Sequence, residues 1–100
     1  MGNLIVTNSA GLLPIVEIEV TKNDQTVKKI AGQSIANGYS SNPIPLEPCV
    51  YGVTVTFKGG NINTKVVKEC VPIEQEKDTI LEIFQAPQEP KIIIRANLVR

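Results

Sequence analysis

The segment from Leu46 to Cys70 constrains the fold more than any other part of this 100-residue chain, because it has the pattern of a β-hairpin. In its first half every second residue is a large apolar one: Tyr51, Val53, Val55 and Phe57. This two-residue period is typical of a strand with one buried face. Gly59-Gly60 then marks the turn, since glycine adopts positive φ without the steric penalty of a Cβ. We therefore expect an antiparallel pair of strands that covers a hydrophobic core.

The two cysteines of the chain lie near the two ends of this hairpin. A two-residue loop at Gly59-Gly60 places Phe57 opposite Ile62 and, counted outward, Cys49 opposite Cys70. In such a hairpin the cysteine pair belongs to the non-hydrogen-bonded class, in which the two residues are closer. This register predicts that Cys49 and Cys70 can form a cross-strand disulfide on the core side. Two buried free thiols are the alternative.

The rest of the chain also has the pattern of short strands separated by turns. The Asn23-Asp24 turn joins two of these strands, and its loop length decides whether Val20 faces Val27 or Ile18 faces Ile30. No apolar stripe of helical period is long enough to form a helix. About seven short strands with regular turn signals predict a single all-β domain, an antiparallel β-sandwich. Besides the hairpin, strand patterns cover residues 4–7, 16–21, 26–30, 79–84 and 91–100.

The C-terminal part has more apolar residues than one buried face needs. We assign residues 1–86 to the sandwich, 87–90 to a stiff proline linker, and 91–100 to a strand that packs on its own or on a neighbouring sandwich. Continuous apolar strands are usually covered on both faces. We therefore expect a homo-oligomer with Ile92, Ile93 and Ile94 at or near the contact. The alternative is that the linker or a loop folds over the outer face.

Composition excludes several classes of function. Ten basic and ten acidic residues cancel, whereas nucleic-acid binding depends on the neutralisation of phosphates. No apolar run approaches the length of a membrane span, and the first residues lack the basic start and apolar core of a signal peptide. Without histidine the chain lacks the usual base for a catalytic nucleophile, and two cysteines do not complete a zinc tetrad. We expect no nucleic-acid partner, membrane insertion, cofactor, metal site or catalytic residue. The sequence does not determine the cellular compartment. A secreted or cell-surface location would require a leader that was removed or another export route.

The segment from Gly32 to Pro48 is the irregular part of the chain. It contains two glycines and three prolines, which interrupt ladders and helices alike. Long loops in small domains are often functional, and we single out Tyr39 and Asn42 as a candidate binding site. The alternative is a plain connection between the two sheets, with a short edge strand around Tyr39.

The spacing of residues 46–57 resembles that of the transthyretin-like (prealbumin-like) sandwiches of the carboxypeptidase regulatory kind. Their pattern is Leu-Pro-Pro-Gly-x-Tyr followed by alternating valine and threonine, and the matching residues are Leu46, Pro48, Tyr51, Val53 and Val55. The family's Gly-x-x-Pro entry into its second strand is matched by Gly11, Pro14, Val16, Ile18 and Val20. Glu47 and Cys49 depart from the pattern, where the family has proline and glycine. An immunoglobulin-like sandwich is the alternative architecture.

The resemblance implies a stalk, an adhesin module, a subunit-contact module or a small-ligand carrier. Together with the absence of catalytic groups, it favours a non-catalytic structural or protein-interaction module that self-associates through its C-terminal strands. The alternative function is a ligand-carrying β-sandwich with its site under the Gly32–Pro48 loop. We do not expect an enzyme.

Overall fold

The computed structural model describes the backbone of residues 1–9, 14–59, 62–85 and 92–99, and their side chains except those of 33, 59, 62–64, 84, 85 and 92–99. Eight β-strands account for most of this part of the chain, and no helix occurs in it. The strands are β1 (Gly2–Ser9), β2 (Ile15–Lys22), β3 (Gln25–Ile35), β4 (Ile44–Leu46), β5 (Cys49–Gly59), β6 (Ile62–Ile73), β7 (Asp78–Gln85) and β8 (Ile92–Val99).

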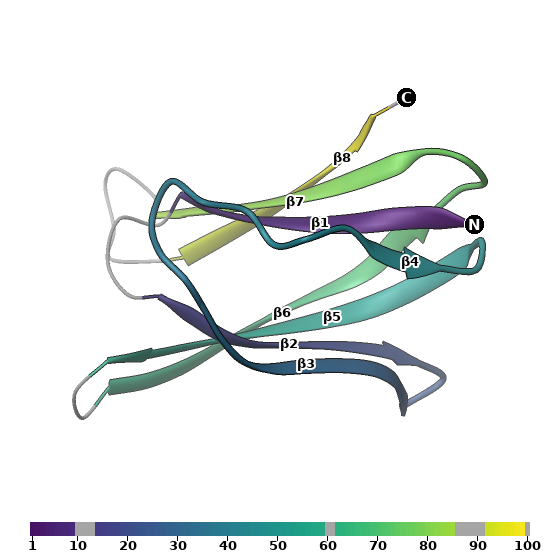
Figure 1. The fold of residues 1–100 in the computed structure, drawn as a ribbon. Helices are drawn as coiled ribbons and strands as arrows, with labels where there is room; N and C mark the ends of the chain where they lie inside the picture. The colour runs from purple at the N-terminus through teal and green to yellow at the C-terminus, as the bar shows by residue number, and fades with distance from the viewer. Residues whose placement is uncertain (10–13, 60–61, 86–91, 100) are drawn as a thin grey trace.

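The strands form two four-stranded sheets that lie face to face (Figure 1). One sheet has the order β4-β1-β7-β8, and the other has the order β3-β2-β5-β6. The all-β sandwich expected from the sequence is therefore confirmed. Two details differ from the expectation: β1 and β7 run parallel, and a short strand, β4, lies within the segment that was expected to be irregular. The proposed linker at 87–90 lies outside the described residues, and β8 pairs antiparallel with β7 of its own chain.

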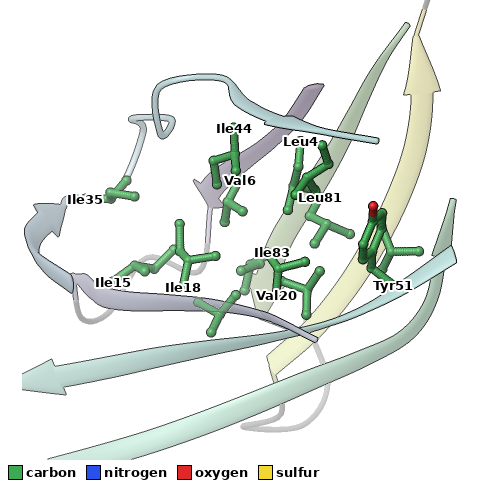
Figure 2. Packing of buried hydrophobic residues seen from close by; sticks show 14 of the residues in the cluster. Leu4, Val6, Ile15, Ile18, Val20, Ile35, Ile44, Tyr51, Leu81 and Ile83 are labelled. Carbon is green, nitrogen blue, oxygen red and sulfur yellow. The ribbon is translucent and has the colours of Figure 1, made fainter. Parts of the chain in front are cut away.

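The core lies between the two sheets and receives apolar side chains from seven strands. Figure 2 shows how side chains from the two sheets point toward one another. Phe57 is the largest of the fully buried side chains, and each fully buried aliphatic side chain contributes about 1.5–3 kcal/mol. The described core consists of Leu4, Val6, Ile15, Ile18, Val20, Ile35, Ile44, Leu46, Tyr51, Val53, Val55, Phe57, Val71, Ile73, Leu81 and Ile83.

The β2–β3 hairpin combines a tight turn with a bulge. Ile18 pairs with Ile30, which confirms one of the two registers considered for this hairpin. The other register, with Val20 opposite Val27, is wrong. The turn residues Asn23 and Asp24 both have positive φ, 53° and 62°, the conformation of a primed two-residue turn that Asn and Asp tolerate well. A register shift between Val20 and Thr21 places Ile18 opposite Ile30 despite this short loop.

The β5–β6 hairpin is present, but its register differs from the predicted one by two residues. Gly59 pairs with Ile62, so Phe57 lies opposite Thr64 and not opposite Ile62. A shift of two residues leaves every side chain of β5 on the same face, because side chains alternate with a period of two. The burial predicted for the apolar residues of β5 is therefore confirmed despite the wrong register.

The predicted pairing of Cys49 with Cys70 is wrong. Cys49 lies opposite Ile73, and a register shift between Tyr51 and Val53, near the open end of the hairpin, leaves Cys70 without a direct partner on β5. Cys70 has a φ of 58°, which is the left-handed region and fits a β-bulge, where one strand carries an extra residue. Both cysteines are free; Cys49 is half-buried and Cys70 is exposed.

β6 extends to Ile73, beyond the Leu46–Cys70 segment in which the hairpin was expected. Val71 and Ile73 are buried core residues, and the Thr79 hydroxyl donates a hydrogen bond to the Pro72 carbonyl at 2.6 Å. The turn that follows covers Gly2, where a Cβ would collide with the Glu74 carbonyl oxygen. Glycine at this position lets the turn pack closely against β1.

Replacement of Phe57 by alanine tests the core. Phe57 is 1 % exposed, so Phe57→Ala should lower the free energy of unfolding by about 3–5 kcal/mol. Thr54→Ala, on the outer face of the same strand, is the control and should cost less than about 1 kcal/mol. Urea unfolding followed by circular dichroism measures both. Equal losses for the two variants would contradict the assigned faces of β5.

Candidate functional site

A hollow of about 330 Å³ opens between the end of β3 and the segment that leads to β4. Its volume falls at the lower end of the range for small-molecule sites, about 300–1,000 Å³. Most lining residues carry a hydroxyl or an amide, two are apolar, and none is charged. The residues that line the hollow are Ser34, Ile35, Ala36, Tyr39, Ser40, Ser41 and Asn42.

Backbone hydrogen bonds to β1 hold the segment that lines the hollow. The Asn8 N–H donates to the Tyr39 carbonyl at 3.0 Å, and the Gly38 N–H donates to the Asn8 carbonyl at 2.7 Å. The Ser41 N–H donates to the Val6 carbonyl at 2.8 Å. β4 pairs with the first residues of the same strand. The segment and β4 therefore share β1 as their support.

Two buried side chains reinforce this attachment. The Ser41 hydroxyl accepts a hydrogen bond from the Val6 N–H at 2.9 Å, and the Asn8 side-chain amide donates to the Ile35 carbonyl at 2.8 Å. Asn8 and Ser41 are both buried, and buried backbone groups need such partners to avoid a large desolvation cost. One wall of the hollow is thus fixed to β1 by its own Ser41 side chain, and the other is held by the Asn8 side chain of β1.

The turn between the two walls depends on a glycine. Gly38 has a φ of 89°, a conformation that favours glycine, and the Tyr39 N–H donates to the Ala36 carbonyl across the turn at 3.1 Å. The edge strand expected around Tyr39 is reduced to a single bridge between Thr7 and Ser40. Their hydroxyls lie 2.8 Å apart and share a hydrogen bond.

Both residues selected from the sequence, Tyr39 and Asn42, line the hollow. Tyr39 is 67 % exposed, which places its ring at the rim. The wall formed by residues 34–36 was not identified from the sequence. β3 continues to Ile35, and no local pattern shows that this end of the strand faces residues 39–42. The run of serines was a visible signal, but only the fold gathers it around one space.

Ser41→Ala tests whether the buried hydroxyl supports the hollow. The change leaves the buried Val6 N–H without its acceptor, so the free energy of unfolding should fall by about 1–3 kcal/mol. Ser40→Ala is the matched control, since the hydroxyl contact of Ser40 is exposed and its loss should cost less than about 1 kcal/mol. Urea unfolding measures both variants. A Ser41→Ala protein as stable as the control would contradict the role of the hydroxyl.

A further polar contact, which is partly buried, fixes the start of β5. Tyr51 is 5 % exposed, and its hydroxyl donates to the Glu47 carbonyl at 2.6 Å. The pKa of Tyr51 is raised above its ordinary value. Burial of the phenol is the main cause, and the negative charge of an ionised Cys49 is the second. The neutral hydroxyl is therefore favoured, and it holds the connection between β4 and β5 in place.

Tyr51→Phe should reveal this contact through its pH dependence. Below pH about 10, the pKa of an unfolded tyrosine, the variant should be less stable than the parent by about 1 kcal/mol. Because the folded pKa is raised, the contribution of Tyr51 to stability is complete below the unfolded pKa and is lost as the pH rises through the folded pKa. The difference between the two proteins should therefore shrink in alkaline solution. Urea unfolding at pH values on both sides of the unfolded pKa measures it, and a constant difference would contradict the assignment.

The candidate interface residues occupy the last strand of the first sheet. Ile92, Ile93 and Ile94 pair with Gln85, Phe84 and Ile83 of β7. Their side chains lie outside the described part of the chain, so the structure places the backbone of these residues and not their contacts. Since β8 ends the order β4-β1-β7-β8, its other edge faces away from the sheet.

Charged side chains make isolated ion pairs and hydrogen bonds at the surface. Lys29 lies 3.4 Å from Glu17, and Glu19 accepts a hydrogen bond from the Thr26 hydroxyl at 2.6 Å. Such exposed contacts contribute less than about 1 kcal/mol. In the described ranges, histidine, cysteine and carboxylate side chains form no group of three that could hold a metal ion. No helix among the described residues is long and apolar enough to cross a membrane.

Comparison with known proteins found no match among family models, curated proteins or solved structures.

Proposed function

We propose that this protein is a non-catalytic structural or protein-interaction module that self-associates through its C-terminal strands. The proposal depends on how the edge strands of the two sheets differ. Edge strands carry unpaired backbone groups, and proteins usually protect them with prolines, charges, bulges or short length. An edge strand without these features is a candidate for pairing with another chain.

Three of the four edge strands carry such protection. β4 has three residues and contains Pro45. β3 carries Lys28 and Lys29 on adjacent exposed positions. β6 contains the bulge at Cys70 and, two residues further along the same strand, Pro72. Each of these edges is poorly suited to extend its sheet into a neighbouring molecule.

The sequence of β8 is the observation that carries the proposal. The strand has eight residues, Ile-Ile-Ile-Arg-Ala-Asn-Leu-Val, and six of them are apolar. It contains no proline and no glycine, and Arg95 is its single charged residue. Antiparallel pairing of β8 with β8 of a second copy would join two sheets through a closed, two-fold contact.

The outer face of the same sheet adds apolar surface close to this edge. Ile5 of β1 pairs with Ile80 of β7, and both are partly exposed on the face that points away from the core. β7 is the direct neighbour of β8. Apolar surface beside an open edge favours association over exposure to water.

A transthyretin-like assignment is part of the proposal. Its support is the placement of the matching residues: Leu46 ends β4, Pro48 lies in the connection, and Tyr51, Val53 and Val55 enter the core from β5. Modules of this kind that serve as subunit contacts need no catalytic group, in agreement with a chain that lacks histidine.

Ile93→Lys tests self-association. The parent protein should sediment as a homo-oligomer, and the variant should sediment as a monomer with an unchanged circular dichroism spectrum, because a charge on an open strand edge opposes pairing. Val67→Lys is the matched control: Val67 is 56 % exposed on β6, the corresponding edge strand of the other sheet. This control should sediment as the same oligomer as the parent. A parent that is monomeric at high concentration, or dissociation of both variants, would contradict association through β8.

A further inference from the structure

The hollow beside Tyr39 has the chemistry of a site for a neutral, polar ligand. None of its lining residues carries a charge, so the site offers neither a cation for a phosphate or carboxylate nor an anion for an amine. The accessible surface of the lining is about half polar and half apolar, and Ile35 and Ala36 are its two apolar residues. A purely hydrophobic ligand would therefore leave the polar half of the lining without hydrogen-bond partners.

Three polar side chains of the lining are available to a ligand. Within the described part of the chain, the side chains of Ser34, Tyr39 and Asn42 take part in no hydrogen bond, whereas Ser40 and Ser41 use their hydroxyls to hold the wall. Two hydroxyls and one amide supply both donors and acceptors. This combination matches a ligand that itself carries several hydroxyl groups.

The ring of Tyr39 supplies the second element of recognition. Tyr39 is 67 % exposed, although large aromatic residues usually lose most of their surface on folding. The face of an aromatic ring is electronegative and attracts groups of positive partial charge. The C–H groups on one face of a sugar ring are polarised in this way by the neighbouring oxygens, so a sugar can stack on Tyr39 while its hydroxyls face the polar lining.

We propose that this hollow binds a neutral sugar, either a terminal unit or part of a short oligosaccharide. The ring stacks on Tyr39, and its hydroxyls bond Ser34 and Asn42. Because β1 holds the walls in place through Val6 and Asn8, the site is preformed and binding orders little additional chain. The site lies within one chain and is independent of association through β8.

Titration of the ¹⁵N-labelled full chain with simple sugars tests this proposal. Methyl α-glucoside, methyl β-galactoside, methyl α-mannoside and N-acetylglucosamine are each added up to tens of millimolar. At least one should shift amide resonances of residues 34–42 with a millimolar dissociation constant. Tyr39→Ala should weaken binding about tenfold, as expected for loss of a stacking platform, and Tyr39→Phe should bind about as the parent does, since it keeps the aromatic ring.

One control variant and one further test variant make the outcome decisive. Val27→Ala removes an exposed apolar side chain of β3 that does not line the hollow, and it should bind as the parent does. Asn42→Ala, at an exposed position, should weaken binding and serves as the second test if Tyr39→Ala fails to fold. Absence of shifts with every sugar, shifts confined to other residues, or unchanged binding by Tyr39→Ala would overturn the proposal. Binding of uridine or adenosine at Tyr39 in place of the sugars would overturn the ligand class.

Discussion

The hydrogen bonds of β1 are the interaction on which the rest of the structure depends. One edge of this strand pairs in parallel with β7, and the other edge holds β4 and then the segment that contains Tyr39. Leu4 and Val6 of the same strand are fully buried, so β1 cannot leave its place without exposing core surface to water. Because one strand contributes buried side chains to the core and also supports the connection between the sheets, the stability of the sandwich and the shape of the hollow are coupled.

The two proposed activities use opposite ends of the same sheet. In the order β4-β1-β7-β8, the segment around Tyr39 lies on the β4 side of β1, and the open edge lies at β8. Association through β8 would therefore leave the hollow accessible in each copy. Binding at several linked sites raises the effective affinity for a ligand that repeats the same unit. Under the two proposals, assembly through β8 would therefore compensate for a low affinity at each single hollow.

The β5–β6 hairpin shows why buried faces are easier to predict than strand partners. The register expected from Gly59-Gly60 was wrong by two residues, yet the core residues of β5 were correct, because the side-chain period is two. The bulge at Cys70 adds one residue to β6 and changes the pairs that follow it. A prediction about a single cross-strand pair, Cys49 with Cys70, therefore failed, although the prediction about the face did not.

The sequence by itself determined most strands of the sandwich and the buried face of β5, since alternation of apolar and polar residues is local and reports which face is buried. It also indicated Tyr39 and Asn42 as residues of interest in an irregular segment. Only the tertiary structure decided that β1 runs parallel to β7, that β8 is an edge strand of its sheet, and that residues 34–36 and 39–42 line one hollow. These arrangements rest on backbone hydrogen bonds between segments distant in the chain, and backbone groups are nearly the same in every residue, so no local sequence pattern specifies their partners.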